Sequence, residues 1–222
     1  RPLHWILLLF GEEQLKFKAF GVSSSNFTRG HRFRNNVEIV IDEPTQYEKV
    51  LSAVGHVIPN FEKRKDLIRA EVLEQAALAN ASASVDEELL DEVTSLVEYP
   101  MALTGEFDSA FLKVPPEALI LAMKTHQKCF HMNDAKGNLV PKFITVSNIR
   151  SKDPVQVIKG NERVIRPRLA DAKFFFETDK QLTLESRLEG LKNLIFQNEL
   201  GSIHCKVERV AKISKSIAKS LS

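Results

Sequence analysis

The sequence is poor in cysteine and contains no long apolar run, and each shortage argues against a class of protein. Its two cysteines, Cys129 and Cys205, lie far apart and form no CxxC pair. This spacing argues against a disulfide framework and a structural zinc site, and it fits a reducing cytoplasm. The strongest apolar run, WILLLF at residues 5–10, is too short to span a bilayer and is followed by Glu12 and Glu13 rather than by a signal-cleavage site. We therefore expect a cytoplasmic protein without a membrane anchor.

A strong net charge and the common catalytic motifs are also missing. The formal net charge of the 222 residues is only +2, so any nucleic-acid role must rest on local basic patches. The sequence contains no P-loop, dinucleotide-binding GxGxxG, nucleophile elbow or HExxH motif. Carboxylates are numerous, but no pair of them stands out. Composition alone therefore indicates a globular chain with enough apolar residues for a core.

Strand patterns are present in the first two thirds of the chain. An apolar run at 5–10 and an alternating run at 15–20, separated by Gly11, predict a hairpin with a buried first strand. A polar loop is expected to follow, then a strand at 37–41. Further on, a strand is predicted at 100–107 and a hairpin with its turn at Gly137, formed by the segments 128–134 and 139–149.

Helical patterns alternate with these strands. We expect helices at 44–55, capped by Asp42 and ended by Gly55, and at 61–80, capped by Asn60. Ser84 and Glu87 predict a capping box before the next helix. The long helix should bury the apolar residues that follow a 3.6-residue period, namely Phe61, Ile68, Val72 and Leu73. A helix is also expected at 114–127, and helices from Pro154 to the end, with breaks at Pro167, Thr183 and Gly201.

These elements predict an α+β fold with a mixed or antiparallel sheet, packed helices and a helical tail. Their order is too irregular for a doubly wound sheet. We expect one α+β region at 1–200, including the helices of 154–198, and a new helical domain from 201. The chain starts at Arg1 inside a strand-like run and ends inside a helical pattern, which favours a fragment of a longer protein.

Residues 159–179, KGNERVIRPRLADAKFFFETD, combine cations and aromatics most densely. Guanidinium groups suit bidentate phosphate contacts. The segment 150–173 has seven basic residues against three acids, which predicts a phosphate-contacting surface made of Arg150, Lys152, Lys159, Arg163, Arg166, Arg168 and Lys173. The alternative is a packed amphipathic helix starting at Pro167, whose arginines pair with carboxylates such as Asp171 or Glu162. In both cases we expect the three consecutive phenylalanines to lie in the core.

Two other segments contain candidate site residues. In TRGHRF, Arg29, His31 and Arg32 surround a glycine and predict an anion or phosphate contact, with a solvated turn as the alternative. In THQKCFHM, a cysteine lies between two histidines, which would suit a metal or a Cys/His nucleophile. No second ligand pair follows, and we expect Cys129 to be a small buried apolar residue.

Five segments are more specific together than apart: TRGHRF (28–33), VPPEALILAMKTHQKCF (114–130), FITVSNI (143–149), GNERVIRPRLADAKFFFETD (160–179) and LGSIHCKVERV (200–210). In this order they resemble the β subunits of bacterial heterotetrameric glycyl-tRNA synthetases, and the resemblance covers essentially the whole chain. Tyr99 and Cys129 stand where the family would have Trp and Tyr, and both differences concern packing.

The resemblance implies part of an α2β2 class II aminoacyl-tRNA synthetase, which joins glycine to its tRNA with ATP. The adenylate-forming site, with its ATP and Mg, would belong to the α subunit, and the β subunit would bind and position tRNA. Residues 1–200 would be similar to the B3/B4-type domain of the phenylalanyl enzyme, and 201–222 would begin an HD-like domain. The implied partners are therefore the α subunit and tRNA(Gly), with no cofactor in this chain, and the isolated chain is expected to be inactive.

Three roles remain open for this part of the subunit. The first is a non-catalytic module for tRNA binding and subunit assembly. The second is a hydrolytic editing module, by analogy with the B3/B4 domain, although no nucleophile stands out and fold analogy does not carry function. The third is a structural spacer.

Overall fold

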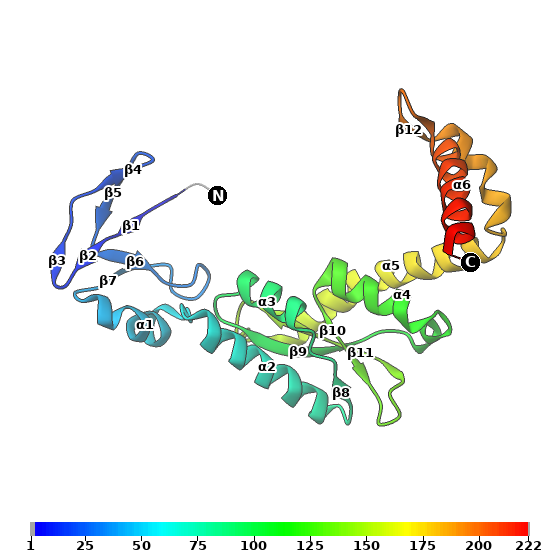
Figure 1. Ribbon diagram of the computed structural model, residues 1–222. Coiled ribbons are helices and arrows are strands. Elements are labelled where there is room, and N and C mark those ends of the chain that lie inside the picture. The colour runs from blue at the N-terminus through cyan, green and yellow to red at the C-terminus, as the bar shows by residue number, and fades with distance from the viewer. Residues whose placement is uncertain (1–2, 222) are drawn as a thin grey trace. The chain divides into compact units, whose positions relative to one another are not determined.

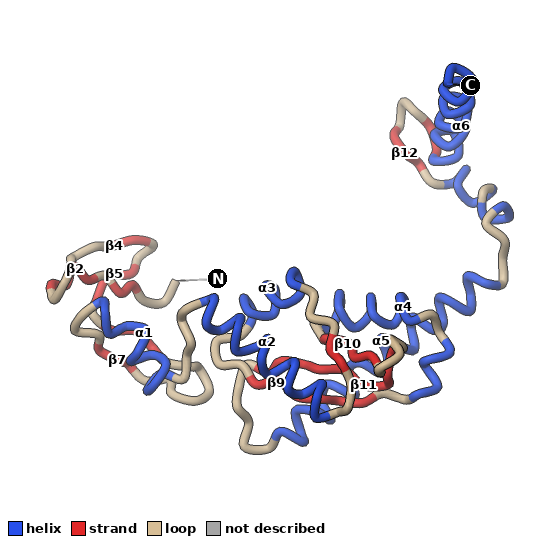
Figure 2. The backbone as a smooth tube through the Cα atoms, turned by 60° about the horizontal axis from the view of Figure 1, so that its bottom comes forward, coloured by secondary structure: helices blue, strands red, loops and turns tan. Residues whose placement is uncertain are grey.

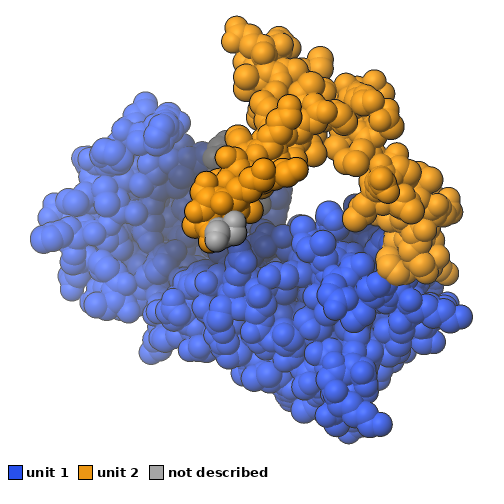
Figure 3. Space-filling view, turned by 45° about the vertical axis from the view of Figure 1, so that its right-hand side comes forward, with its two compact units in different colours: residues 1–172 blue, residues 173–222 orange. Residues whose placement is uncertain are grey.

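The computed structural model describes residues 3–221 and divides into two compact units, residues 1–172 and 173–222 (Figures 1 and 3). No helix among the described residues is long and apolar enough to cross a membrane. The helices and helical turns that begin in the first unit are η1 (Pro44–Gln46), α1 (Tyr47–Val50), η2 (Leu51–Gly55), α2 (Phe61–Leu78), α3 (Glu87–Leu96), η3 (Ser109–Lys113), α4 (Pro116–Leu121), η4 (Ala122–His126) and α5 (Pro154–Lys180).

The N-terminal segment forms three small sheets, with the strand orders β1-β5-β4, β2-β3 and β6-β7. Their strands are β1 (Ile6–Leu7), β2 (Leu9–Phe10), β3 (Glu13–Gln14), β4 (Lys18–Ala19), β5 (Val22–Ser25), β6 (Phe27–Arg29) and β7 (Glu38–Val40). The hairpin at Gly11 and the strand at 37–41 are confirmed. The predicted partner strand at 15–20 is wrong, because β3 pairs with β2 and β4 pairs with β5. Phe10 is 76% exposed, so the first run is not uniformly buried.

The polar segment after Gly21 was expected to be a loop but contains β5 and β6. The strand β1 pairs in parallel with β5, and β6 pairs antiparallel with β7. The serines of β5 can enter a sheet because they also bond locally: the Ser24 hydroxyl accepts from Phe17 N–H and donates to the Leu15 carbonyl. Backbone pairing therefore overrides the low strand propensity of this segment.

Helix caps follow the sequence predictions in part. The Asn60 side chain accepts from Lys63 N–H and caps α2, as predicted. The cap of α3 is Asp86, which accepts from Leu89 N–H, so the capping box predicted at Ser84 is wrong. The first short helix begins after Glu43 without a side-chain cap, so Asp42 does not have the predicted role. Leu73 is 48% exposed and does not belong to the buried face of α2.

A four-stranded antiparallel sheet forms the centre of the first unit, in the order β8-β10-β11-β9 (Figures 1 and 2). Its strands are β8 (Ser82–Ala83), β9 (Met101–Glu106), β10 (Phe130–Asn133) and β11 (Leu139–Ser147). The β10–β11 hairpin confirms the prediction around Gly137. Opposite Gly105 lies the fully buried Phe143, whose ring would be 2.5 Å from a Cβ at the glycine. The glycine thus makes room for the aromatic ring.

Helices pack against this sheet because its strands direct apolar side chains toward the helices. On one side, Ile144 of β11 joins Ile68 of α2 and Leu90 of α3 in a buried cluster. The next residue, Thr145, points to the other side, where its hydroxyl lies 3.5 Å from the Asn161 side chain of α5. Two residues of α5, Ile165 and Leu169, are buried, while the other residues of the helix are partly or fully exposed.

Helix α5 continues through Pro167, where a break was predicted. Proline removes one backbone hydrogen bond and normally kinks a helix. Here Ile165 and Leu169 are 1% and 0% exposed on either side of the proline, and their burial holds the helix on the sheet. The helix ends at Lys180, close to the predicted break at Thr183.

The second unit contains the end of α5 and the elements η5 (Glu185–Arg187), η6 (Glu189–Asn193), β12 (Ile195–Gln197), β13 (Gly201–Ser202) and α6 (Ile203–Leu221). The all-helical prediction is therefore wrong at 195–202, where β12 and β13 form a hairpin. Phe174 and Phe175 are 64% and 63% exposed, so they do not lie in a core as predicted. None of the described side chains of α6 is buried. The domain boundary expected at Gly201 stays a prediction.

Candidate nucleic-acid interface

Helix α5 exposes a row of cations on its outer surface. Lys159, Arg163 and Arg166 are exposed and follow one another at spacings of four and three residues, so they lie on one side of the helix. The row is about 10 Å long at 1.5 Å per residue. Among the described residues none of the three makes an ion pair, so the predicted alternative, pairing with Asp171 or Glu162, is not seen.

Three further basic residues of the predicted surface lie outside this row. Arg168 is also exposed, but five residues after Arg163 it is turned by about 140° around the helix. Lys173 is exposed and belongs to the second unit. Lys152 is exposed in the turn before α5, where the Asp153 side chain accepts from Gln156 N–H. The structure therefore does not bring the whole predicted set together.

Arg150 has a structural environment. Its guanidinium forms an ion pair with Glu71 of α2 and lies 5.7 Å from the centre of the Tyr99 ring. The other carboxylate oxygen of Glu71 accepts from Ala102 N–H of β9 at 2.8 Å. The Glu71 side chain is only 16% exposed, so this pair joins a helix, a strand and the segment before α5. A phosphate at Arg150 would have to compete with Glu71.

Arg166 has acidic neighbours although it makes no ion pair with any residue in the described range 3–221. It lines a shallow pocket of about 300 Å³ together with Glu106, Asp108 and Glu162. Glu162 accepts from Glu106 N–H, Glu106 pairs with Lys142 at 3.4 Å, and Asp108 caps η3. Nearby negative charge lowers the attraction of Arg166 for a phosphate. Lys159 and Arg163 are therefore the better candidates in the row for contacts with phosphate.

The three predicted site residues of the TRGHRF segment lie in three different environments. Arg29 pairs with Glu38 across β6 and β7 at 3.0 Å. His31 is 1% exposed, and its ring accepts from Phe33 N–H through Nδ1 and lies 2.6 Å from the Asn148 carbonyl through Nε2. These contacts give His31 a structural role and no access to a ligand. Arg32 is exposed and, within residues 3–221, has no ion-pair partner.

Sequence reasoning missed two residues of the same turn. Phe33 is 78% exposed, and Arg34, directly after it, is exposed as well. An aromatic residue between two arginines in a predicted polar loop is a signal for nucleic-acid contact that could have identified them.

The THQKCFHM segment offers no thiolate for hydrolysis. Cys129 is 1% exposed, which confirms it as a small buried residue, and burial raises the pKa of its thiol to about 12. Burial also lowers the pKa of the half-buried His131. Both cysteines of the chain are free thiols. A protonated, buried thiol is a poor nucleophile.

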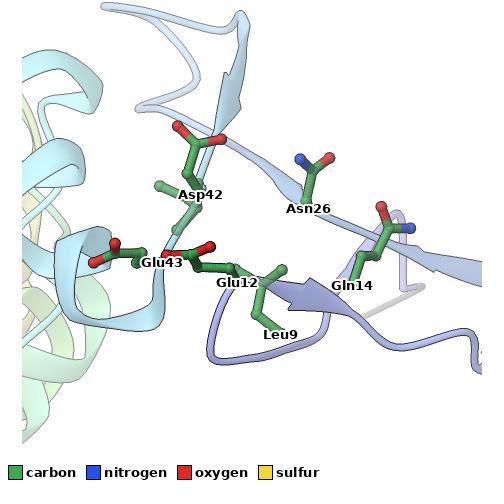
Figure 4. Close-up of a pocket in the computed structure, with 7 residues that line it drawn as sticks. Leu9, Glu12, Gln14, Asn26, Asp42 and Glu43 are labelled. Carbon is green, nitrogen blue, oxygen red and sulfur yellow. The ribbon is translucent and has the colours of Figure 1, made fainter.

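A second pocket, of about 350 Å³, lies among the N-terminal strands (Figure 4). Its polar lining is acidic or neutral: Glu12, Gln14, Asn26, Asp42 and Glu43. No group of three or more histidines, cysteines or carboxylates in residues 3–221 is arranged to hold a metal ion. The charge of this pocket would repel a phosphate, so it is not a candidate for the nucleic-acid surface.

Comparison with known proteins places the chain in a family. Residues 1–222 match the family described as glycyl-tRNA synthetase beta subunit. The chain is 53% identical over 218 residues to the glycine--tRNA ligase beta subunit of Hahella chejuensis, covering 98% of this chain and 32% of that protein. The corresponding protein of Marinobacter nauticus is 50% identical over 225 residues, covering 100% of this chain and 32% of the relative.

The chain thus spans about a third of the length of the curated relatives it matches. The same relationship holds for the beta subunit of Coxiella burnetii, which is 46% identical over 221 residues. The match covers every segment discussed above, including α5 and the turn at 32–34. The chain belongs to the glycyl-tRNA synthetase beta subunit family.

Proposed function

We propose that this chain is a non-catalytic tRNA-binding part of a glycine–tRNA ligase in the cytoplasm. In this proposal the α subunit activates glycine with ATP and Mg in an α2β2 assembly. The present chain holds tRNA(Gly) by its backbone and helps to assemble the two kinds of subunit. Family membership supports the enzyme, and the surface of α5 supports the role of the chain within it.

The observation that carries the proposal is the row of exposed cations on α5, which have no ion-pair partners in the part of the chain that the structure describes. An unpaired guanidinium or ammonium on a rigid helix loses no existing partner when it contacts a phosphate. Elsewhere in the first unit, basic side chains such as Arg29 and Arg150 already have carboxylate partners. The row is therefore the side of this helix on which several cations without ion-pair partners among the described residues lie together.

The chemistry of the row favours backbone contact over base reading. Arg163 and Lys159 can approach phosphate oxygens from the outer side of α5 without entering a groove. Phosphate contacts position a protein on a nucleic acid and carry no direct sequence information. We therefore expect the row to contribute affinity, while discrimination among tRNAs is made elsewhere in the enzyme.

The test uses the full-length β subunit assembled with its α subunit. The double variant Lys159→Gln/Arg163→Gln should bind tRNA(Gly) more weakly. Since each phosphate contact contributes about 0.7–0.9 to the slope of log K against log salt, the slope should become shallower by about 1.4–1.8. The preference for tRNA(Gly) over other tRNAs should not change.

Arg168→Gln is the matched control, because it removes the same charge from the same helix on another side. It should keep the wild-type slope. A folded double variant with the wild-type salt slope would remove the row from the RNA surface and contradict the proposal. A lower thermal midpoint of the double variant would instead assign these residues to stability.

A further inference from the structure

The turn at residues 32–34 connects β6 and β7 (Figure 1). In its sequence an exposed aromatic residue stands between two exposed arginines. Phe33 is 78% exposed, and Arg32 and Arg34 are exposed on either side of it. An isolated exposed apolar side chain is common on protein surfaces, so exposure alone assigns no role to Phe33. The two arginines that flank it in sequence are the feature that points to a polyanionic partner.

The turn is held in place by a buried anchor. The ring of His31 accepts from Phe33 N–H through Nδ1 at 3.3 Å, which assigns its proton to Nε2, the donor to the Asn148 carbonyl. The His31 carbonyl accepts from Arg34 N–H and Asn35 N–H at 3.0 and 2.9 Å. The exposed ring therefore stands on a fixed backbone.

A glycine completes this anchor. A Cβ at Gly30 would lie 2.5 Å from the Asn35 carbonyl oxygen and 2.7 Å from the Gly55 carbonyl oxygen. His31 N–H donates to that Gly55 carbonyl at 2.7 Å, and the Asn35 side chain donates to the Val54 carbonyl. The base of the turn is thus packed against the end of η2, and little ordering entropy remains to be lost on binding.

No carboxylate neutralises the two arginines of the turn. Within the described chain neither Arg32 nor Arg34 makes an ion pair. The nearest acid that follows in sequence, Glu38, is paired with Arg29 at 3.0 Å. The turn therefore combines two arginines, without ion-pair partners among the described residues, with one exposed aromatic ring between them in sequence.

We propose that the turn at 32–34 binds an unpaired RNA nucleotide, with its base stacked on Phe33 and its flanking phosphates held by Arg32 and Arg34. A base offers a flat π-face and its phosphates offer the negative charge, so one ligand satisfies all three side chains. A paired base could not reach the ring without being unstacked from its helix. The proposal rests on the proposed function in that RNA is the partner, and it adds a second contact of a different chemical kind.

The chain contains a matched control for the aromatic. Phe10 is 76% exposed, close to the value of Phe33, but it is followed in sequence by Glu12 and Glu13. Its acidic surroundings disfavour RNA. Both phenylalanines can be replaced without opening a core, so their variants should fold equally well.

The experiment measures binding of tRNA(Gly), and of a short single-stranded RNA and a duplex of the same length, to the assembled full-length enzyme. Phe33→Ala should weaken tRNA binding by about 5- to 150-fold, the range of about 1–3 kcal/mol measured for one stacked base, with an unchanged salt slope. It should weaken the single strand and spare the duplex. Phe33→Trp should retain binding, and Phe10→Ala should bind like the wild type.

The charges of the turn should give the opposite signature. Arg32→Gln/Arg34→Gln should make the salt slope shallower by about 1.4–1.8, for two lost phosphate contacts. If Phe33→Ala binds all three RNAs like the wild type, the inference is overturned. The proposed function then still stands, provided that Lys159→Gln/Arg163→Gln changes the slope. If Phe33→Ala instead weakens association with the α subunit and leaves RNA binding intact, the turn binds protein and the inference is equally wrong.

Discussion

Helices α2 and α5 have the same number of basic residues in the first unit and use them in opposite ways. Each has four, which are Lys63, Arg64, Lys65 and Arg69 on α2, and Lys159, Arg163, Arg166 and Arg168 on α5. All four on α2 contact protein groups. None of the four on α5 makes an ion pair within the part of the chain that the structure describes.

The partners of α2 come from neighbouring elements. Lys65 lies 2.5 Å from Asp91 and 3.2 Å from Glu87 of α3, and Arg69 contacts both carboxylate oxygens of Glu87. Lys63 pairs with Glu48 of α1 at 2.6 Å. The acidic first turns of α3 thus neutralise one side of α2.

Among residues 3–221, no helix supplies ion-pair partners to the four cations of α5 in the first unit. Its own Glu162 is engaged by Glu106 N–H, and Asp171 has no cation partner in the described chain. The two helices therefore have equal counts of basic residues and differ in how many of these have a carboxylate partner among the described residues. The proposed function uses this difference.

The largest expected difference between the two helices concerns stability. Arg64 of α2 donates to the carbonyls of Ile58, Pro59 and Thr94, and so fixes the segment before α2 to the end of α3. Arg64→Ala should lower the free energy of unfolding by about 1.5–3 kcal/mol, the range for hydrogen bonds that involve a charged group. Arg163→Ala should change it by less than about 0.5 kcal/mol, as is usual for an exposed side chain without partners.

Urea unfolding of the full-length subunit measures both values. Equal losses would mean that Arg163 has a structural partner after all and that the two helices do not differ. Such a result would also weaken the phosphate proposal, because a cation with a structural partner is not free.

The same contrast shows what the sequence could predict. The Asn60 cap and the β10–β11 hairpin follow from residues close together in the chain, and both are confirmed. The ion-pair partner of Arg150 is Glu71, 79 residues away, and no local pattern reveals it. The position of the basic segment was therefore predictable, while its division into paired and unpaired cations was not.

Errors in the fold have the same origin. Pro167 predicts a break by a local rule, but burial of Ile165 and Leu169 overrides it. Phe174 and Phe175 are apolar, which predicts burial, but both side chains are exposed in the second unit. In both cases tertiary packing, which a single sequence does not display, decides the outcome.

A smaller effect is expected when a further carboxylate is added to the cation row of α5. Ala170 is exposed four residues after Arg166, so Ala170→Glu would place a negative charge in the cation row. The variant should weaken tRNA binding and make the salt slope shallower by less than the change of about 1.4–1.8 expected for Lys159→Gln/Arg163→Gln, without loss of stability. Ala70→Glu, on an exposed position of α2, is the control and should leave tRNA binding unchanged. Similar effects of the two variants would show that only the total charge of the subunit matters.

The smallest effect concerns the acid stability that α2 derives from its pairs. The hydrogen bond from Arg69, and next that from Lys65, lower the pKa of Glu87 from an ordinary value of 4.5 to about 2. Because the folded pKa is the lower one, the stabilisation is fully present above pH 4.5 and is lost as the pH falls toward 2. Glu87→Gln removes this contribution. Its thermal midpoint should therefore be below that of the wild type at neutral pH, and the difference should shrink between pH 4.5 and 2.

Asp171→Asn on α5 provides the comparison for this last test. Asp171 has no cation partner in residues 3–221, so its replacement should leave the thermal midpoint at neutral pH close to that of the wild type. Midpoints measured from pH 7 to 2 in the full-length subunit distinguish the two variants. A Glu87→Gln curve that runs parallel to the wild type throughout would show that the pairs of α2 contribute nothing in solution. The cations of α2 would then have more carboxylate neighbours than those of α5 without being bound more strongly. In this respect the exposed row of α5 would no longer differ from the paired surface of α2.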